Sequence, residues 1–98
     1  MDFKIVWTLR ARQDLRDVAT FIAKDNPPAA LKLGGLIFTR VNSLETFPEL
    51  GRVVPNYDRS KLREIIVKSY RIIYRVRTTE KVVEILRVWH GARGEPEF

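Results

Sequence analysis

Three short β-rich runs in the second half of the chain constrain the fold more than any other feature. The runs are Leu62–Val67, Arg71–Arg77 and Val82–Trp89, and each is rich in β-branched and aromatic side chains. The separators, Lys68–Tyr70 and Thr78–Lys81, are far shorter than the dozen or so residues that a parallel crossover needs. The three runs therefore predict three neighbouring antiparallel strands.

The middle run divides by alternation into an apolar face and a basic face. Ile72, Tyr74 and Val76 form the first face, and Arg71, Ile73, Arg75 and Arg77 form the second. We expect the first face to lie in the core, where Tyr74 packs, and the second to face outward as a strongly basic surface.

The first half of the chain predicts one strand and one helix, followed by a second helix. Phe3–Trp7 is rich in β-forming residues and predicts a strand. Thr8 offers a hydroxyl at the N-cap of the first helix, and Asp25–Pro28 ends that helix. The second helix is expected to begin at Pro28 or Ala29 and to close at Phe47-Pro48. The expected core stripes are Ala11, Leu15, Val18, Ala19 and Ile22 in the first helix, and Ala30, Leu33, Ile37, Val41 and Leu44 in the second.

A glycine pair interrupts the second helical pattern. Gly34-Gly35 is interpreted as a close helix–helix contact or a slight bend, because phosphate-binding glycines belong at a strand-to-helix junction. Residues 49–60 are expected to form an irregular connection. The predicted fold is α+β with the order β-α-α-β-β-β, a two-helix hairpin packed on an antiparallel sheet, in a single domain spanning residues 1–98.

Composition excludes several classes of function. The chain has no cysteine, which excludes disulfide scaffolds and thiolate chemistry, and its single histidine, His90, argues against a metal centre. No apolar run approaches the roughly 18 residues of a membrane span, and no signal segment is recognisable. We expect a soluble cytoplasmic protein that needs neither metal nor cofactor and makes no membrane contact.

The net charge of +6 is concentrated in the second half of the chain. Residues 50–98 carry eleven basic and six acidic side chains, against seven and six in residues 1–49. Arginine outnumbers lysine twelve to six, which favours recognition of phosphates or carboxylates. The residues expected to bind a target or partner are Arg59, Lys61, Arg63, Arg71, Arg75, Arg77, Arg87 and Arg93. Trp7 and Trp89 are expected in the core.

Several short strings along the chain resemble the RelE/ParE toxins of bacterial toxin–antitoxin modules. The most specific strings are Tyr70–Val76 and Val83–Arg93, preceded by Val6-Trp7-Thr8, Gly51-Arg52 and Leu62-Arg63-Glu64. The resemblance covers nearly the whole chain and implies the fold predicted above. It also implies the toxin of a type II (plasmid stabilisation) system, neutralised by a small antitoxin that alone contacts operator DNA.

The resemblance leaves two targets open. ParE-like members inhibit DNA gyrase without hydrolytic chemistry of their own, and the ending His90-Gly91-Ala92-Arg93 is more similar to that branch. RelE-like members are metal-independent endoribonucleases that cleave mRNA, often on the ribosome. We favour gyrase inhibition, and keep the ribonuclease and a non-toxic nucleic-acid-binding module as alternatives.

A ribonuclease of this kind needs proton transfer and cations at the reacting phosphate. His90 would transfer the proton, Arg63, Arg71 and Arg75 would stabilise charge, Tyr70 or Tyr74 would stack on a base, and Glu64 is a conceivable base. The structural interpretation of His90 is that it caps the end of the last strand. No residue is therefore assigned as catalytic from the sequence alone.

Overall fold

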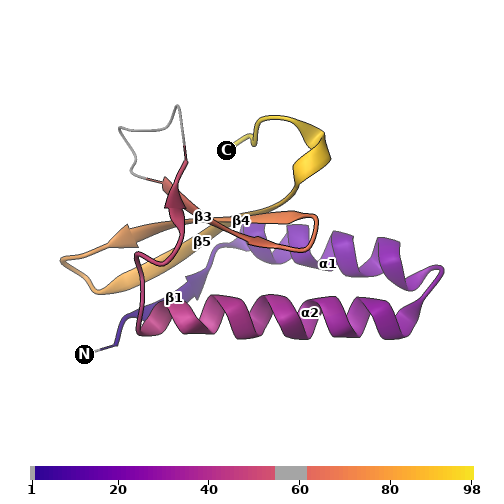
Figure 1. Ribbon diagram of the computed structural model, residues 1–98, viewed down its shortest axis with the longest axis horizontal. Helices are drawn as coiled ribbons and strands as arrows, with labels where there is room; N and C mark the ends of the chain where they lie inside the picture. The colour runs from indigo at the N-terminus through magenta and orange to yellow at the C-terminus, as the bar shows by residue number, and fades with distance from the viewer. Residues whose placement is uncertain (1, 55–61) are drawn as a thin grey trace.

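The computed structural model describes residues 2–54 and 62–98, which form two helices packed against one face of a five-stranded sheet (Figure 1). The strands are β1 (Lys4–Trp7), β2 (Arg52–Val53), β3 (Leu62–Val67), β4 (Tyr70–Arg77) and β5 (Val82–His90). The helices are α1 (Leu9–Ala23) and α2 (Pro27–Asn42), with short 3-10 turns at Ser43–Glu45 and Gly91–Arg93. The predicted α+β class and element order are confirmed.

The sheet has the strand order β1-β5-β4-β3-β2. Strands β3, β4 and β5 form the predicted antiparallel series. The sheet is not wholly antiparallel, however, because β1 pairs with β5 in parallel. The two-helix hairpin makes this possible, since it carries the chain across the sheet from β1 at one edge to β2 at the other.

Strand β2 lies in the stretch that the sequence predicted as irregular. Arg52 pairs with Glu64 and Val53 with Arg63, which extends the sheet by two residues. A strand this short carries no alternation that a sequence pattern would reveal. Residues 55–61, which include Arg59 and Lys61, lie outside the described residues.

Helix α1 begins where predicted, beside the sheet. The Thr8 hydroxyl oxygen accepts a hydrogen bond from the backbone N–H of Ala11 at 3.1 Å, and the same hydroxyl donates to the carbonyl of Ile85 at 2.8 Å. The N-cap therefore also fixes the start of the helix to β5.

Helix α2 begins at Pro27, one or two residues earlier than expected. The Asn26 side-chain oxygen accepts from the N–H of Ala29 at 3.2 Å, and Pro27 and Pro28 occupy the first turn, where a missing N–H costs nothing. The helix ends at Asn42 and passes into a 3-10 turn, before the predicted end at Phe47-Pro48. Among the described residues, no helix has the length and apolar character that crossing a bilayer requires.

The main core lies between the helices and the sheet, and it contains most of both predicted helical stripes, with Ala19, Ile22 and Ala30 outside it. Its buried members are Ala11, Ile37, Val41, Leu44, Ile65, Val67, Ile72, Tyr74, Val83, Ile85 and Val88. Tyr74 is fully buried, as predicted, and its hydroxyl accepts a hydrogen bond from the N–H of Gly51 at 2.8 Å. Burial raises the pKa of the Tyr74 hydroxyl above its ordinary value.

The opposite face of the sheet carries a second, smaller core, so it is not the uniformly basic surface that alternation predicted. Val54, Leu62, Ile73 and Trp89 are buried together there. A register shift at Ile73/Tyr74, where Ile73 pairs with Arg87 and Tyr74 with Ile85, changes the spacing of inward side chains along β5. Alternation in β4 alone gave no sign that Ile73 would be covered.

The glycine pair of α2 makes no close contact with another element, so the first of its two interpretations, a close helix–helix contact, is wrong. A Cβ atom built on Gly34 or Gly35 would meet no heavy atom within 4 Å. Gly51 is the opposite case, since a Cβ there would lie 2.5 Å from the carbonyl oxygen of Glu64 and 2.7 Å from the Tyr74 hydroxyl.

These environments predict opposite effects for one kind of substitution. Gly34→Ala and Gly35→Ala should each stabilise the protein by about 1 kcal/mol, because alanine favours a helix interior and nothing obstructs its methyl group. Gly51→Ala should destabilise it, because the methyl group collides with backbone. Thermal unfolding followed by circular dichroism measures both, and a loss of stability in the α2 variants would contradict the open environment.

Candidate functional site

The C-terminal residues fold over the outer face of the sheet. The indole N–H of Trp89 donates to the carbonyl of Gly94 at 3.1 Å, and the Arg93 guanidinium lies 4.0 Å from the centre of the Trp89 ring. Arg93, a predicted binding residue, therefore stacks on the side chain that anchors this segment.

Glu64 lies beneath this segment with both carboxylate oxygens occupied. One oxygen accepts from the Arg71 guanidinium at 2.5 Å and the other from Arg52 at 2.6 Å, and the Glu64 side chain is fully buried. A second carboxylate, that of Glu95, lies 3.9 Å from Arg71. Neither oxygen of Glu64 is open to accept a proton from a ribose hydroxyl, and Arg71 is committed to this ion pair.

Arg75 and Arg77 are paired with one acidic residue of the next strand. Both guanidinium groups lie 2.9 Å from the same oxygen of Glu84. Burial by itself would raise the pKa of Glu84, but hydrogen bonds from Arg77 and Arg75, and their charges, outweigh it and hold the pKa below its ordinary value.

Arg87 is a structural residue in this fold. It is 4% exposed and pairs through two nitrogens with Asp14 of α1, at 2.7 and 3.0 Å. Asp14 also accepts the backbone N–H of Val88 at 3.0 Å, and Arg87 donates to the carbonyl of Glu97. Asp14, for which the sequence predicted no role of its own, therefore joins α1, β5 and the C-terminal residues.

Arg63 lies apart from the other predicted charge-stabilising residues. Leu62 and Glu64, the neighbours of Arg63 in β3, are buried on the outer face, so Arg63 projects from the other face. Its guanidinium donates to the carbonyl of Gly51 at 2.7 Å and, more weakly, to that of Glu49 at 3.3 Å. It thus supports the turn that leads into β2.

His90 lies beside α1, near the end of β5. Its Nδ1 accepts the backbone N–H of Ala92 at 3.0 Å, which caps the turn that follows the strand, and this geometry places the proton of neutral His90 on Nε2. Its ring meets the edge of Tyr70, with the centres 5.0 Å apart. His90, Tyr70 and Arg93 line a hollow of about 310 Å³ together with Asp17 and Phe21 of α1.

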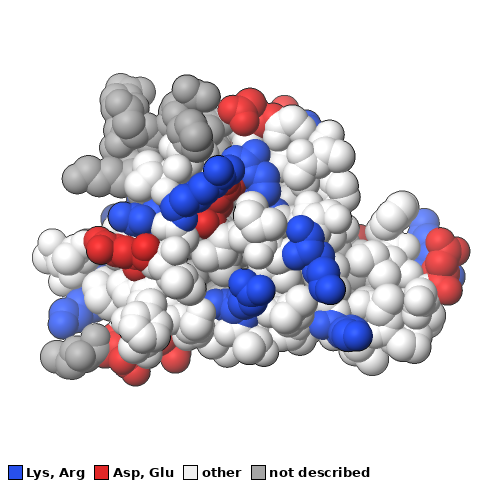
Figure 2. Space-filling view, in the orientation of Figure 1, with Lys and Arg blue, Asp and Glu red and all other residues white. Residues whose placement is uncertain are grey.

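The residues that a ribonuclease would use are thus divided between two faces of the sheet. Register places Arg71 opposite Trp89 and Tyr70 opposite His90, so Arg71 and His90 project from opposite faces of the sheet. In the space-filling view, basic side chains lie in separate groups, some directly beside acidic ones (Figure 2). Among residues 2–54 and 62–98, no three histidine or carboxylate side chains are placed to hold a metal ion.

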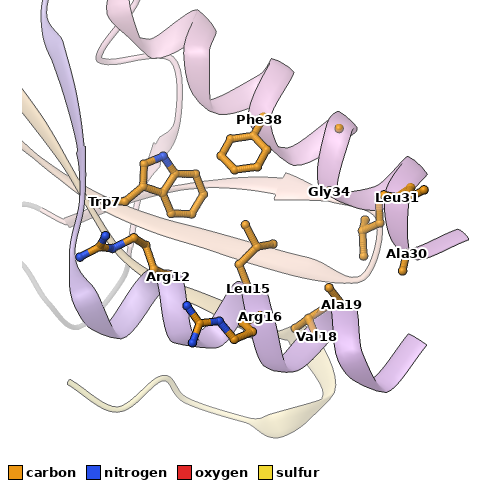
Figure 3. A pocket seen from close by; sticks show the side chains of 12 residues that line it. Trp7, Arg12, Leu15, Arg16, Val18, Ala19, Ala30, Leu31, Gly34 and Phe38 are labelled. Atoms are coloured by element: carbon orange, nitrogen blue, oxygen red, sulfur yellow. The ribbon is translucent and has the colours of Figure 1, made fainter. Parts of the chain in front are cut away.

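An apolar hollow that the sequence did not predict lies between α1 and α2. It measures about 440 Å³ and is lined almost entirely by apolar side chains and glycines (Figure 3). We refer to it as the helical groove, lined by Trp7, Arg12, Leu15, Arg16, Val18, Ala19, Ala30, Leu31, Leu33, Gly34, Gly35 and Phe38.

Aromatic side chains form one end of the helical groove. The rings of Trp7 and Phe38 lie 5.3 Å apart at a tilt of 54°, with Leu15 facing them from α1 (Figure 3). Trp7 is only half-buried, and Phe38 and Leu31 are 46% and 80% exposed. The signal available in the sequence was the apolar residues of α2 that fall outside its core stripe, Leu31 and Phe38.

The rim of the helical groove is basic. Arg12 and Arg16 lie one turn apart along α1, both exposed (Figure 3). Neither forms an ion pair with another residue in the described part of the chain. Unlike the sheet arginines that pair with Glu64, Glu84 and Asp14, they are open to an acidic partner.

Comparison with known proteins gives a consistent result. The sequence profile described as "ParE toxin of type II toxin-antitoxin system, parDE" matches residues 5–94. The chain is 36% identical to the protein Y4kP of Sinorhizobium fredii (96% of this chain and 94% of that protein). It is 35% identical to Toxin RelE2 of Caulobacter vibrioides (92% and 97%).

Solved structures agree on the fold. The "Chromosomal ParDE TA system from P. aeruginosa" contains a chain with a TM-score of 0.75 at 23% identity, covering 90% of this chain and 95% of that one. The toxin–antitoxin complex RelBE2 of Mycobacterium tuberculosis gives a TM-score of 0.64 at 23% identity, covering 92% and 99%.

Removing Asp14 should expose the structural role of Arg87. Asp14→Ala should lower the free energy of unfolding by about 3–5 kcal/mol, because it leaves a buried guanidinium without its carboxylate. Asp17→Ala is the matched control on the same helix, since Asp17 is exposed, and it should change stability by less than about 0.5 kcal/mol. Equal effects in urea unfolding would refute the role assigned to the Asp14–Arg87 pair.

Glu84 should make the protein sensitive to acid. Because its pKa is lowered in the folded state, its contribution to stability is complete above the unfolded pKa of about 4.3 and is lost as the pH falls through the folded value. Glu84→Gln should therefore lose less stability than the wild type between about pH 5 and pH 3. Urea unfolding across this range tests it, with the exposed Glu80→Gln as a control that should follow the wild type.

Proposed function

This chain belongs to the ParE toxin family of type II toxin–antitoxin systems, and on that premise we propose that it arrests growth by binding DNA gyrase and that an antitoxin neutralises it. It would act as a binding protein, with no hydrolytic step of its own. Operator DNA would be contacted through the antitoxin.

The observation that carries this proposal is the separation of the groups that RNA cleavage would require. His90 lies on the helical side of the sheet, while Arg71 and Arg75 pair with Glu64 and Glu84 on the outer side. Cleavage needs a base, an acid and cations around one phosphate. His90 and these two arginines therefore do not converge on one phosphate, whereas binding to a protein requires only an accessible surface.

The helical groove supports the antitoxin part of the proposal. An amphipathic helix lays its apolar face into a groove of this kind, and acidic residues on its flank would meet Arg12 and Arg16. The two named structural neighbours are themselves toxin–antitoxin systems. A second copy of this chain fits less well, because it would bring further basic side chains to the same rim.

One observation favours the ribonuclease alternative. The hollow beside α1 brings His90, Tyr70 and Arg93 together, and Nε2 of His90 takes no part in the cap. A group that transfers protons, an aromatic ring and a cation are three of the components that the alternative needs. A test on His90 therefore separates the two functions.

His90→Asn removes proton transfer near neutral pH but keeps a side-chain oxygen that can accept the N–H of Ala92. We expect this variant to arrest growth as strongly as the wild type when induced without antitoxin, measured by viable counts at matched protein levels. Purified wild type and variant should also inhibit supercoiling by gyrase equally. Loss of arrest in His90→Asn, in a protein that melts like the wild type, would contradict gyrase inhibition and support the ribonuclease.

A further inference from the structure

Gly34 and Gly35 have no function inside this chain that the structure reveals. Neither approaches another element, since a Cβ on either would meet no heavy atom within 4 Å, and neither has a positive φ. Glycine in a helix interior weakens the helix. The space that they leave open is therefore available to a group from outside the chain.

That space is part of the helical groove. Gly34 and Gly35 belong to the α2 wall, opposite Val18 and Ala19 of α1, and Phe38 follows Gly34 by one helical turn (Figure 3). A side chain at these positions would project into open space beside the groove. Its absence leaves a notch next to the aromatic end.

We propose that this notch receives one large apolar side chain of the antitoxin helix, and that it determines which antitoxin binds. The inference rests on the proposed function, because it takes an antitoxin helix as the occupant of the helical groove. The pair is then a specificity determinant, and filling it should exclude the matching partner without harming the fold.

The positions on the groove define the pattern that the partner should carry. Gly34 and Phe38 are one turn apart, about 6 Å along the axis, and Arg12 and Arg16 have the same separation on α1. The partner helix should therefore carry two large apolar residues three or four positions apart. Two acidic residues, also one turn apart, should lie on the flank that meets α1.

A library of displayed helices tests this pattern even while the sequence of the antitoxin is unidentified. The probe is an alanine-rich helix of about five turns with two glutamates one turn apart and randomised positions on its apolar face. It is selected separately on the full-length wild type, on Gly34→Leu and on Thr39→Leu. Thr39 is exposed on α2 outside the groove, so the last variant adds the same side chain elsewhere.

The wild type and Thr39→Leu should both select leucine, methionine, phenylalanine or tryptophan at one position. Gly34→Leu should select alanine, serine or glycine there. Peptides selected on the wild type should bind Gly34→Leu at least about tenfold more weakly in fluorescence anisotropy. Gly34→Leu should melt no lower than the wild type, so unfolding cannot cause the loss.

Two results would overturn the inference, and only the second would also overturn the antitoxin part of the proposed function. If Gly34→Leu selects the same large residue and binds it equally well, the notch has no role, and the helical groove still stands as the antitoxin site. If no selected peptide loses affinity for Phe38→Glu, no helix occupies the groove. The antitoxin part of the proposed function then fails together with the notch.

Discussion

The arrangement of helices, sheet and C-terminal residues depends on one buried ion pair. Strand β1 pairs with β5 from Val82 as far as Ile85. Within the described part of the chain, the rest of that edge of β5 has no neighbouring strand. Asp14 occupies the edge instead, accepting the N–H of Val88 while it pairs with Arg87, which in turn donates to Glu97. The position of α1 on the sheet, and therefore one wall of the helical groove, follows from this contact.

The distribution of charge gives the two faces of the molecule different roles. Most arginines of the sheet pair with Glu64, Glu84 or Asp14 and so hold the strands together, whereas Arg63 donates to backbone carbonyls. The cations left without carboxylates at the helical groove are Arg12 and Arg16, from the half of the chain with little net charge. Net charge by segment indicates a basic protein, but it does not show which of the cations pair with carboxylates.

Local rules predicted most of the fold. The short separators determined the antiparallel series, the helical stripes identified the core, and Thr8 marked the start of α1. Features that depend on distant pairings were missed. The Asp14–Arg87 pair joins residues 73 positions apart, and the covering of Ile73 depends on Val54, Leu62 and Trp89, which come from other segments of the chain. The helical groove was missed because amphipathic periodicity shows which residues face the core, whereas a groove depends on how far apart two helices lie.

Under the proposed function, this ParE-family chain acts by binding and not by cutting RNA. Transcriptome-wide mapping of RNA 5′ ends within minutes of inducing the wild-type chain, without antitoxin, tests it most directly. We predict growth arrest with a DNA-damage response and no new RNA ends. New ends clustered within coding sequences would contradict the account and make the hollow around His90 the active site.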